Sequence, residues 1–370
     1  MRPSQIRPDD LAEAMGMSVD RLWAMARNID VCYRTRRMQW DGKKHRPIDP
    51  LYKRPKKLLR RLHGFLQRNR LRHPAAHGGI SGRSCFTSAR LHLGARNVWT
   101  RDASNCYPSI SPQAMHKELR ALGFRADTAR LLIYIFTYRG GVPQGSPVSG
   151  DALNLFFWRL DQLLSSIAGS HGLRYGRIAD DFVLSGNDRD AGEALAQLLE
   201  GELAARGVSV NEKKKRVSGL QTSSDERLVH SISVARRRGT KISRSHTQAA
   251  IKLAENYVAA SRSVTADSIQ AVACKRHAVA GWMYYCRQAD FGPAKTIRNL
   301  LEAGDRHVLR RLRAVGLNSK GNKWWVVNHR AKRNEPKRLS IIWSHILERA
   351  AHCGVENDLA AASVGRRSCA

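Results

Sequence analysis

Apolar residues recur three or four positions apart in several separate stretches of the chain, a spacing that places them on one face of a helix. The pattern predicts an amphipathic helical region within residues 1–30, helices over residues 55–71 and 153–167, and a mostly helical region over residues 248–315. Two more helices are predicted from their caps, because Ser111 precedes Pro112 in a first turn and Asp188 precedes another periodic run.

Short apolar runs bounded by turn residues predict β-strands in the middle of the chain. They cover residues 97–102, 174–178, 182–185 and 208–210. The second and third runs flank Asp180 and Asp181 and therefore predict a hairpin with two acids at its tip. Segments rich in glycine and proline at residues 76–84 and 140–147 predict loops.

The composition adds a large surplus of positive charge. The 370 residues include 64 Lys and Arg against 31 Asp and Glu, a net charge of +33, while 42% of residues are hydrophobic. That hydrophobic share suffices for a packed core, so the surplus indicates a polyanionic partner rather than disorder. The charge is concentrated in residues 43–72, 236–244 and 306–338. Trp324, Trp325 and Trp343 lie in or beside the last cluster, where they suit stacking on bases.

Several classes of protein are not indicated by the sequence. The longest apolar run, from Leu131 to Phe136, has six residues, far fewer than the roughly 20 of a membrane span. No apolar stretch follows the charged first residues as in a secretory signal, so we expect a cytoplasmic protein without a membrane partner. The seven cysteines form no CxxC pair, which argues against a disulfide framework and a zinc ribbon.

The carboxylates point to a metal site. Asp102 ends one predicted strand, and Asp180 and Asp181 lie together at the hairpin tip. Adjacent acids repel each other, and a divalent cation such as Mg²⁺ is the commonest reason for a fold to keep them together. An Asp-Asp pair alone is a weak signal, because Asp9 and Asp10 also form one and are better interpreted as part of a helix cap.

What distinguishes the second pair is the ordered set of motifs around it, which resembles the motifs of reverse transcriptases. Residues 102–110 (Asp-Ala-Ser-Asn-Cys-Tyr-Pro-Ser-Ile) resemble the first palm motif, residues 141–147 the Pro-Gln-Gly motif, residues 178–181 the Tyr-x-Asp-Asp box, and residues 207–214 the Gly-Leu-x-Leu-x-x-x-Lys motif. Residues 43–48 and 76–84 are similar to the fingers motif and the loop that follows it. The resemblance covers about residues 40–235 in the family's order.

The resemblance implies an α+β fold, a right-hand polymerase with fingers, a palm made of an antiparallel sheet plus helices, and a helical thumb. It places an N-terminal extension and the fingers in residues 1–100 and the palm in residues 101–235, with residues 113–140 partly in the fingers. The thumb would be residues 236–315. Residues 316–370 would form a basic, RNA-binding C-terminal extension.

The same resemblance assigns chemistry to individual residues. Asp102, Asp180, Asp181 and the carbonyl of Ala103 would hold two Mg²⁺ ions, with Mn²⁺ as the alternative, for attack of a primer 3′-OH on a dNTP. The predicted nucleotide-binding residues are Lys43, Lys44, Arg46, Tyr107, Gln144, Gly145 and Lys214. Tyr107 would exclude a 2′-OH; without the motif it would be interpreted as a core aromatic residue.

The basic residues would bind RNA and the RNA–DNA hybrid product. Our candidates are Lys56, Lys57, Arg60, Arg61, Arg83, Arg310, Arg311, Lys323, Trp324, Arg330 and Arg333. The template is predicted to be a structured non-coding RNA, and a homo-oligomer or an accessory effector protein is a further expected partner.

The branch of the family is less sharply marked. Residues 88–92 are similar to the retron Asn-Ala-x-x-His signature, with Ser88 replacing Asn, and this favours a retron or phage-defence enzyme. The retron Val-Thr-Gly motif is absent from residues 230–234, and Ile178 replaces the usual Tyr of the acid box. Two alternatives stay open: a template-independent or protein-primed DNA polymerase, and a non-catalytic RNA-binding protein such as a splicing helper.

Overall fold

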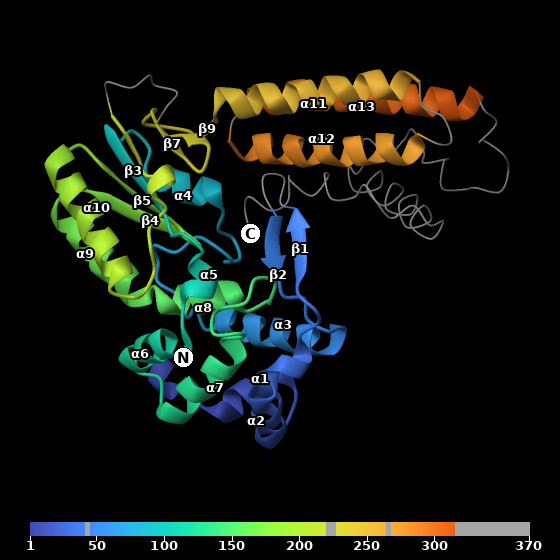
Figure 1. The fold of residues 1–370 in the computed structure, drawn as a ribbon. Coiled ribbons are helices and arrows are strands. Elements are labelled where there is room, and N and C mark those ends of the chain that lie inside the picture. Colours follow the sequence, from blue (N-terminus) through green and yellow to red (C-terminus); the bar gives the residue numbers. More distant parts are fainter. Residues whose placement is uncertain (41–44, 220–226, 264–267, 290, 315–370) are drawn as a thin grey trace. The chain divides into compact units, whose positions relative to one another are not determined.

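A computed structural model describes residues 1–40, 45–219, 227–263, 268–289 and 291–314. Lys43, Lys44 and the predicted RNA contacts Lys323, Trp324, Arg330 and Arg333 lie outside these ranges. The chain divides into two compact units, one containing residues 1–40 and 45–241 and the other beginning at residue 242 (Figure 1).

The first part of the first unit consists of helices and one two-stranded hairpin. Its elements are the 3₁₀ helices η1 (Pro3–Gln5) and η2 (Ile29–Cys32), the helices α1 (Pro8–Met15), α2 (Val19–Arg27), α3 (Lys53–Arg68) and α4 (Cys85–Leu91), and the strands β1 (Arg37–Trp40) and β2 (His45–Ile48). In α3, Leu59, Leu62 and Leu66 are buried on one face, and the helix packs against α1. Burial of this leucine stripe fixes α3 so that its basic residues face outward.

A four-stranded antiparallel sheet forms the centre of this unit. The strands β3 (Asn97–Asp102), β4 (Arg174–Ile178), β5 (Asp181–Gly186) and β6 (Arg216–Ser218) are arranged in the order β4-β5-β3-β6. Tyr175 and Arg177 point toward α9 (Trp158–Ser170), whereas a Cβ on Gly176 would touch Leu91 and His92 at the end of α4. Helices therefore cover both faces of β4, because alternate residues of a strand point to opposite sides (Figure 1).

The remaining helices of the first unit surround one end and one face of this sheet. They are α5 (Cys106–Ser109), α6 (Pro112–Ala121), α7 (Ala126–Phe136), α8 (Ser149–Phe156) and α10 (Arg189–Ala204), with the 3₁₀ helix η3 (Glu212–Lys214). Helix α10 approaches β3 closely, since a Cβ on Gly192 would lie 2.1 Å from the buried ring of Trp99. A small sheet of β7 (Leu228–Val229), β8 (Ile232–Ser233) and β9 (Lys241–Ile242) follows.

In the described part of the second unit, three long helices pack against one another. They are α11 (Arg244–Arg262), α12 (Ile269–Ala289) and α13 (Phe291–Ala314). A buried Arg276 on α12 pairs with Asp305 on α13, and the Tyr257 hydroxyl on α11 donates to the same carboxylate. This polar cluster joins all three helices.

Most elements predicted from the hydrophobic pattern are present, and two predictions need correction. Strands β3 and β4, the capped helices that begin after Ser111 and Asp188, and the helical region after residue 248 are confirmed. The helix predicted over residues 153–167 is two helices, α8 and α9, interrupted at Phe157. The predicted strand at residues 208–210 contributes only an isolated bridge between Val210 and Ala103.

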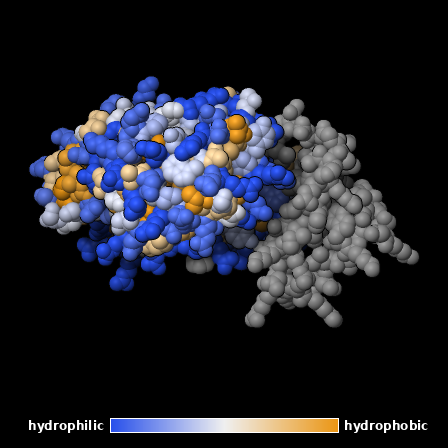
Figure 2. Space-filling model, turned by 90° about the horizontal axis from the view of Figure 1, so that it is seen from below, coloured by the Kyte–Doolittle hydropathy of each residue, from blue (hydrophilic) through white to orange (hydrophobic). Residues whose placement is uncertain are grey.

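In the face drawn in Figure 2, hydrophilic residues predominate and apolar ones form small, separate groups. None of the helices within the described ranges combines the length and the apolar character needed to cross a membrane.

Candidate active site

Strand pairing brings the three predicted catalytic acids together. Asp102 at the end of β3 lies opposite Asp181 at the start of β5, and Asp181 is also paired with Ile178 of β4. Asp180 lies in the tight connection between β4 and β5, which we call the acid turn (residues 178–181). The carbonyl of Asp180 accepts a hydrogen bond of 2.9 Å from the backbone N–H of Ala103. The acid turn is thus attached to the end of β3.

The carboxylates of the acid turn are electrostatically strained. Burial raises the pKa of Asp180, and the negative charge of Asp102 raises it further. The pKa of Asp181 is raised to about 7, first by loss of contact with water and then by the charges of Asp180 and Asp102. Loss of water is the largest cause although 51% of the Asp181 side chain remains exposed. A cation close to the three acids would relieve this repulsion.

Lys214 supplies one positive charge to this cluster. Its Nζ donates to both oxygens of Asp102, at 2.9 and 2.8 Å. Asn211 also binds Asp102. Its backbone N–H donates to the backbone carbonyl of Asp102 at 2.8 Å, and its Nδ2 donates to Oδ1 of Asp102 at 3.5 Å. The Lys214 side chain is 52% exposed, against 15% for Asp102. The lysine can therefore leave the carboxylate without opening the core.

The donor set fits magnesium better than a softer metal. All three side chains offer hard carboxylate oxygens, the ligands that Mg²⁺ prefers. Within the described ranges, no group of three or more His, Cys, Asp or Glu side chains is placed so that it could hold a metal ion. Mg²⁺ commonly takes several of its ligands from substrate phosphates and water.

The loop at residues 141–147 lies against the end of β2 and against α5. The N–H of Asp49 donates to the carbonyl of Gln144 at 2.8 Å. Gly145 has a φ of +111°, and a Cβ there would lie 2.9 Å from the Ile48 side chain. A side chain at this position would therefore meet both backbone strain and a clash. Arg46, two residues before Ile48, lowers the pKa of Asp180 through its charge, which places the guanidinium near the acid turn.

Tyr107 lies between this loop and the acids. Its carbonyl accepts a 2.9 Å hydrogen bond from the N–H of Val142, and a Cβ on Gly141 would lie 2.4 Å from the carbonyl oxygen of Pro108. Burial and, next, the charge of Asp180 raise the pKa of the Tyr107 hydroxyl. The phenol is therefore neutral and close enough to the acid turn to sense its charge.

Comparison with known proteins identifies the family to which this arrangement belongs. The family model for reverse transcriptase (RNA-dependent DNA polymerase) matches residues 39–234, slightly more than half of the chain. The chain belongs to the reverse transcriptase family. Its central sheet, with the acids at one end, is the palm of an α+β right-hand polymerase fold, as predicted.

Individual relatives include reverse transcriptases of retrons. Retron Ec86 reverse transcriptase from Escherichia coli is 28% identical over 214 residues, which cover 57% of this chain and 66% of that protein. Retron Mx65 reverse transcriptase from Myxococcus xanthus is 32% identical over 183 residues, which cover 45% and 43%. Each alignment thus spans less than two thirds of the relative. Apo telomerase from Candida tropicalis superposes with a TM-score of 0.48 at 11% identity, covering 87% of this chain and 62% of that one.

The structure separates the predicted RNA-binding residues of this reverse transcriptase family member into groups. Lys57, Arg60 and Arg61 are exposed on α3 and Lys56 is half-buried, although Arg61 also donates to the carbonyl of Met15 at 2.9 Å. Arg310 is exposed on α13, the helix that also contains Arg311. Arg83 differs, because its side chain is half-buried and its Nη1 already donates to the backbone carbonyls of Pro74 and Ala76. We therefore leave Arg83 out of the RNA surface proposed below.

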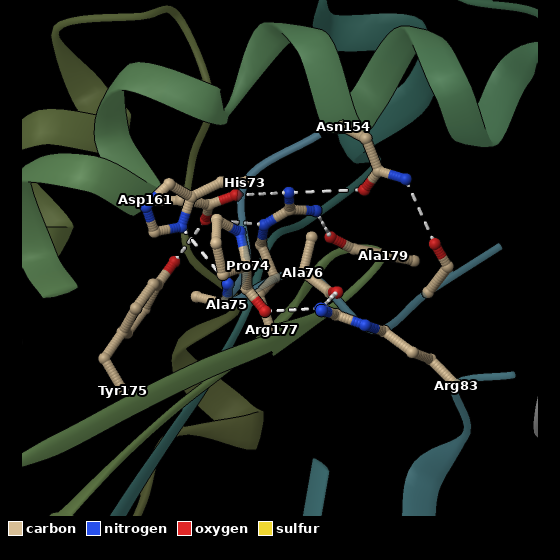
Figure 3. Close-up of polar contacts among 11 residues, drawn as sticks. His73, Pro74, Ala75, Ala76, Arg83, Asn154, Asp161, Tyr175, Arg177 and Ala179 are labelled. Atoms are coloured by element: carbon tan, nitrogen blue, oxygen red, sulfur yellow. Dashed lines mark hydrogen bonds and ion pairs between the residues drawn. The ribbon is translucent and has the colours of Figure 1, made fainter. Parts of the chain in front are cut away.

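Two residues near the acids were not singled out by sequence reasoning. His230, in the turn between β7 and β8, lies 3.9 Å from Asp181, measured from Nδ1 to Oδ2. Arg177, on β4, is fully buried and forms the polar cluster of Figure 3. The sequence places Arg177 in the predicted short strand 174–178, one residue before the acid turn, but nothing in that pattern predicts that the side chain is buried and paired.

Proposed function

We propose that this protein is an RNA-directed DNA polymerase that uses Asp102, Asp180 and Asp181 for nucleotidyl transfer. The observation that carries the proposal is the register of β3 and β5, which sets Asp102 opposite Asp181 with Asp180 in the adjoining turn. This pairing lies inside the segment matched by the reverse transcriptase family. Burial, followed by the repulsion among the three acids, raises the pKa of Asp180 and Asp181, which supports a role for these carboxylates in binding a cation.

In the proposed reaction a primer hydroxyl attacks the α-phosphate of a dNTP, a new phosphorus–oxygen bond forms and pyrophosphate leaves. Two divalent cations, Mg²⁺ or alternatively Mn²⁺, when held by the acids and the Ala103 carbonyl, would neutralise the charge that develops. Arg46 binds the triphosphate. Lys214 leaves Asp102 and donates a proton to the departing pyrophosphate.

The nucleotide is selected by shape. Gln144 and Gly145 line the pocket for the base and sugar, where the close contact between Gly145 and Ile48 leaves no room for a larger residue. Tyr107 packs beneath the sugar and excludes a 2′-OH. Lys43 and Lys44 complete the phosphate-binding set in this proposal, on the resemblance of their motif alone.

The template in this proposal is a structured non-coding RNA, and the setting is bacterial anti-phage defence. Support comes from the similarity to retron reverse transcriptases and from the net charge of +33. Lys57 and Arg60 on the exposed face of α3 contribute to RNA binding, since Lys and Arg that neutralise phosphates release condensed counterions.

One alternative keeps a specific observation in its favour. Ile178 stands where the family's acid box has Tyr, and it is paired directly with Asp181. Loss of the aromatic residue next to the primer end fits a polymerase that starts on a protein or extends without a template. The non-catalytic alternative has less support, because all three acids are present and their strain has no structural benefit.

The deciding experiment is to purify the protein with its bound RNA, add Mg²⁺ and labelled dNTPs, and sequence the product. DNA complementary to the bound RNA, absent with Asp180→Ala/Asp181→Ala, supports the proposal. A homopolymer would favour the template-independent alternative. Absence of any product, in a preparation that is folded and holds RNA, would favour the non-catalytic one.

A further inference from the structure

Arg177 forms the most deeply buried ion pair among the described residues of the first unit. Arg177 and Asp161 each have 0% of the side chain exposed. The guanidinium binds the carboxylate through two bonds, Nε to Oδ1 at 2.9 Å and Nη2 to Oδ2 at 2.7 Å. The Tyr175 hydroxyl donates to the same Oδ1 at 2.6 Å. Figure 3 shows the three side chains meeting between β4 and α9.

The remaining nitrogen of Arg177 reaches the acid turn. Its Nη1 donates to the carbonyl of Ala179 at 2.7 Å. Ala179 has a φ of +49°, in the left-handed region that a residue with a Cβ rarely adopts. A strained conformation of this kind persists only where surrounding contacts enforce it. The hydrogen bond from Arg177 is such a contact, and it acts on the residue immediately before Asp180.

The other side of the acid turn is held by the loop at residues 75–78. A Cβ on Gly78 would lie 2.5 Å from the Ala179 nitrogen, so this loop lies directly against the turn. Asn154 on α8 donates to the Gly78 carbonyl at 3.1 Å and accepts from Arg177 Nη2 at 3.4 Å. Backbone bonds of 2.7 and 2.9 Å also connect Arg177 with His77 and Ala75. The Arg177 guanidinium thus binds the acid turn directly and, through Asn154, contacts the loop that lies on its other side (Figure 3).

From this geometry we propose that Arg177 is a positioning residue that sets the acid turn so that Asp180 and Asp181 can bind a divalent cation. The inference rests on the proposed function for its role in DNA synthesis, but cation binding can be measured without synthesis. A buried ion pair gives little net stability compared with apolar residues of similar volume. Added stability therefore does not explain why an arginine is buried here. The ability of one guanidinium to bind Asp161, Asn154 and Ala179 at the same time does explain it.

The chain contains a matched control. Arg276 in the second unit makes the same pair of bonds to Asp305, at 2.8 and 2.7 Å, and the Tyr257 hydroxyl donates to Asp305 Oδ1 at 2.6 Å. Arg276 lies between helices of the other unit and has no assigned part in the proposed reaction. Arg177→Lys and Arg276→Lys each replace the forked guanidinium and keep the positive charge. A loss that both variants share reports on structure, whereas a loss confined to Arg177→Lys reports on positioning.

The experiment measures thermal unfolding, Mn²⁺ binding by the electron paramagnetic resonance signal of the free ion, and kcat for single-nucleotide addition. Arg177→Lys is expected to weaken Mn²⁺ binding and kcat by roughly 10–100-fold, the range typical when a group that orients metal ligands is lost. Arg276→Lys should leave both within about twofold. Equal Mn²⁺ affinity in the two variants, with equal loss of thermal stability, would overturn the proposal.

A second variant guards against misfolding. Arg177→Met/Asp161→Leu/Tyr175→Phe replaces the buried polar cluster with apolar side chains of similar volume, a change that such sites often tolerate. It removes the bond to Ala179 without leaving an unpaired charge. If this variant folds and binds Mn²⁺ as the wild type does, Arg177 has no positioning role. If the wild type binds Mn²⁺ but makes no DNA, the proposed function fails, and the comparison of Mn²⁺ affinities still decides the role of Arg177.

Discussion

The described residues contain the same Arg–Asp–Tyr arrangement twice, once in each unit. The sheet triad consists of Tyr175, Arg177 and Asp161, and the helix triad consists of Tyr257, Arg276 and Asp305. In both, the guanidinium binds the carboxylate through Nε and Nη2, and the tyrosine hydroxyl donates to Oδ1 at 2.6 Å. The two clusters therefore have the same hydrogen-bonding pattern, and their corresponding distances agree to within a few tenths of an ångström.

What differs is the part of the chain to which each triad is attached. The ion pair of the sheet triad is completely buried, and Arg177 makes a further connection to the strained Ala179 of the acid turn. The helix triad joins α11, α12 and α13, and 15% of the Asp305 side chain is exposed. The same kind of ion pair thus holds helices together in one unit and holds the acid turn in the other.

Removing the carboxylate from each triad should give the largest difference. Asp161→Ala leaves the Arg177 charge buried and unpaired, so we expect a loss of about 3–5 kcal/mol in the free energy of unfolding. Asp305→Ala should cost less, because water can reach part of that site. Urea unfolding of the two variants measures the difference, and an equal cost would contradict the greater isolation of the sheet triad.

The next effect concerns sugar selection, which only the unit with the acids is expected to provide. Tyr107→Ala should raise the efficiency of ribonucleotide addition relative to deoxyribonucleotide addition by roughly 10–200-fold, since the ring occupies the space of the 2′-OH. Tyr257→Ala in the helix triad is the control and should not alter the ratio. Competition between dCTP and CTP on one primed template gives the ratio; an unchanged ratio in Tyr107→Ala would sink the steric assignment.

The triads and the acid turn also differ in charge balance. In each triad an arginine is paired with an aspartate, whereas the acid turn contains two aspartates and no cation. The pKa of Asp181 is raised to about 7 from its ordinary value of 3.8. Between about pH 4 and pH 7 the folded chain therefore binds more protons than the unfolded chain, and metal-free stability should fall as pH rises. We expect Asp181→Asn to recover about 1 kcal/mol at pH 8, a value reduced for the exposure of the side chain.

Chemical unfolding in EDTA at several pH values tests this expectation. The Asp305→Asn variant is the control from the helix triad. If the stability of Asp181→Asn and of the wild type changes with pH in the same way, the acid turn is not electrostatically strained.

The smallest predicted effect lies on the exposed face of α3. Arg60→Ala removes one exposed cation from a helix that contains no residue of either triad. Folding and single-nucleotide addition at saturating RNA should therefore be unchanged. The slope of log K against log salt for RNA binding should become shallower by about 0.7–0.9 for one lost phosphate contact. Filter binding over a salt series measures the slope, and an unchanged slope would remove Arg60 from the RNA surface.

Much of this site could be predicted from sequence because it follows the order of the chain. Strand periodicity located β3 and β4, and the motifs placed Asp102, Asp180 and Asp181 at the strand ends. The register that sets Asp102 opposite Asp181 could be inferred only through the resemblance, since strand pairing depends on contacts distant in sequence. The hairpin β1–β2 was not predicted, because each of its strands has only four residues and Pro47 in the second strand is typical of a strand breaker.

The supporting residues could not be predicted for a different reason. Arg177 looks like one more cation in a chain with 64 Lys and Arg. Its partner Asp161 lies 16 residues earlier, on a helix whose apolar stripe alone was visible in the sequence. Only packing of α9 on β4 buries both charges and excludes water from them. The same holds for Asn154, whose role depends on how closely Gly78 approaches Ala179.

The most direct test of the central claim is single-nucleotide addition on four primed RNA templates that differ in one base. For the wild type, the account predicts that the dNTP added follows the template base and requires Mg²⁺, and that Asp180→Asn reduces the rate by at least about 10³-fold. Arg276→Lys should retain the wild-type rate. Addition that ignores the template base, or that continues in Asp180→Asn, would contradict the account.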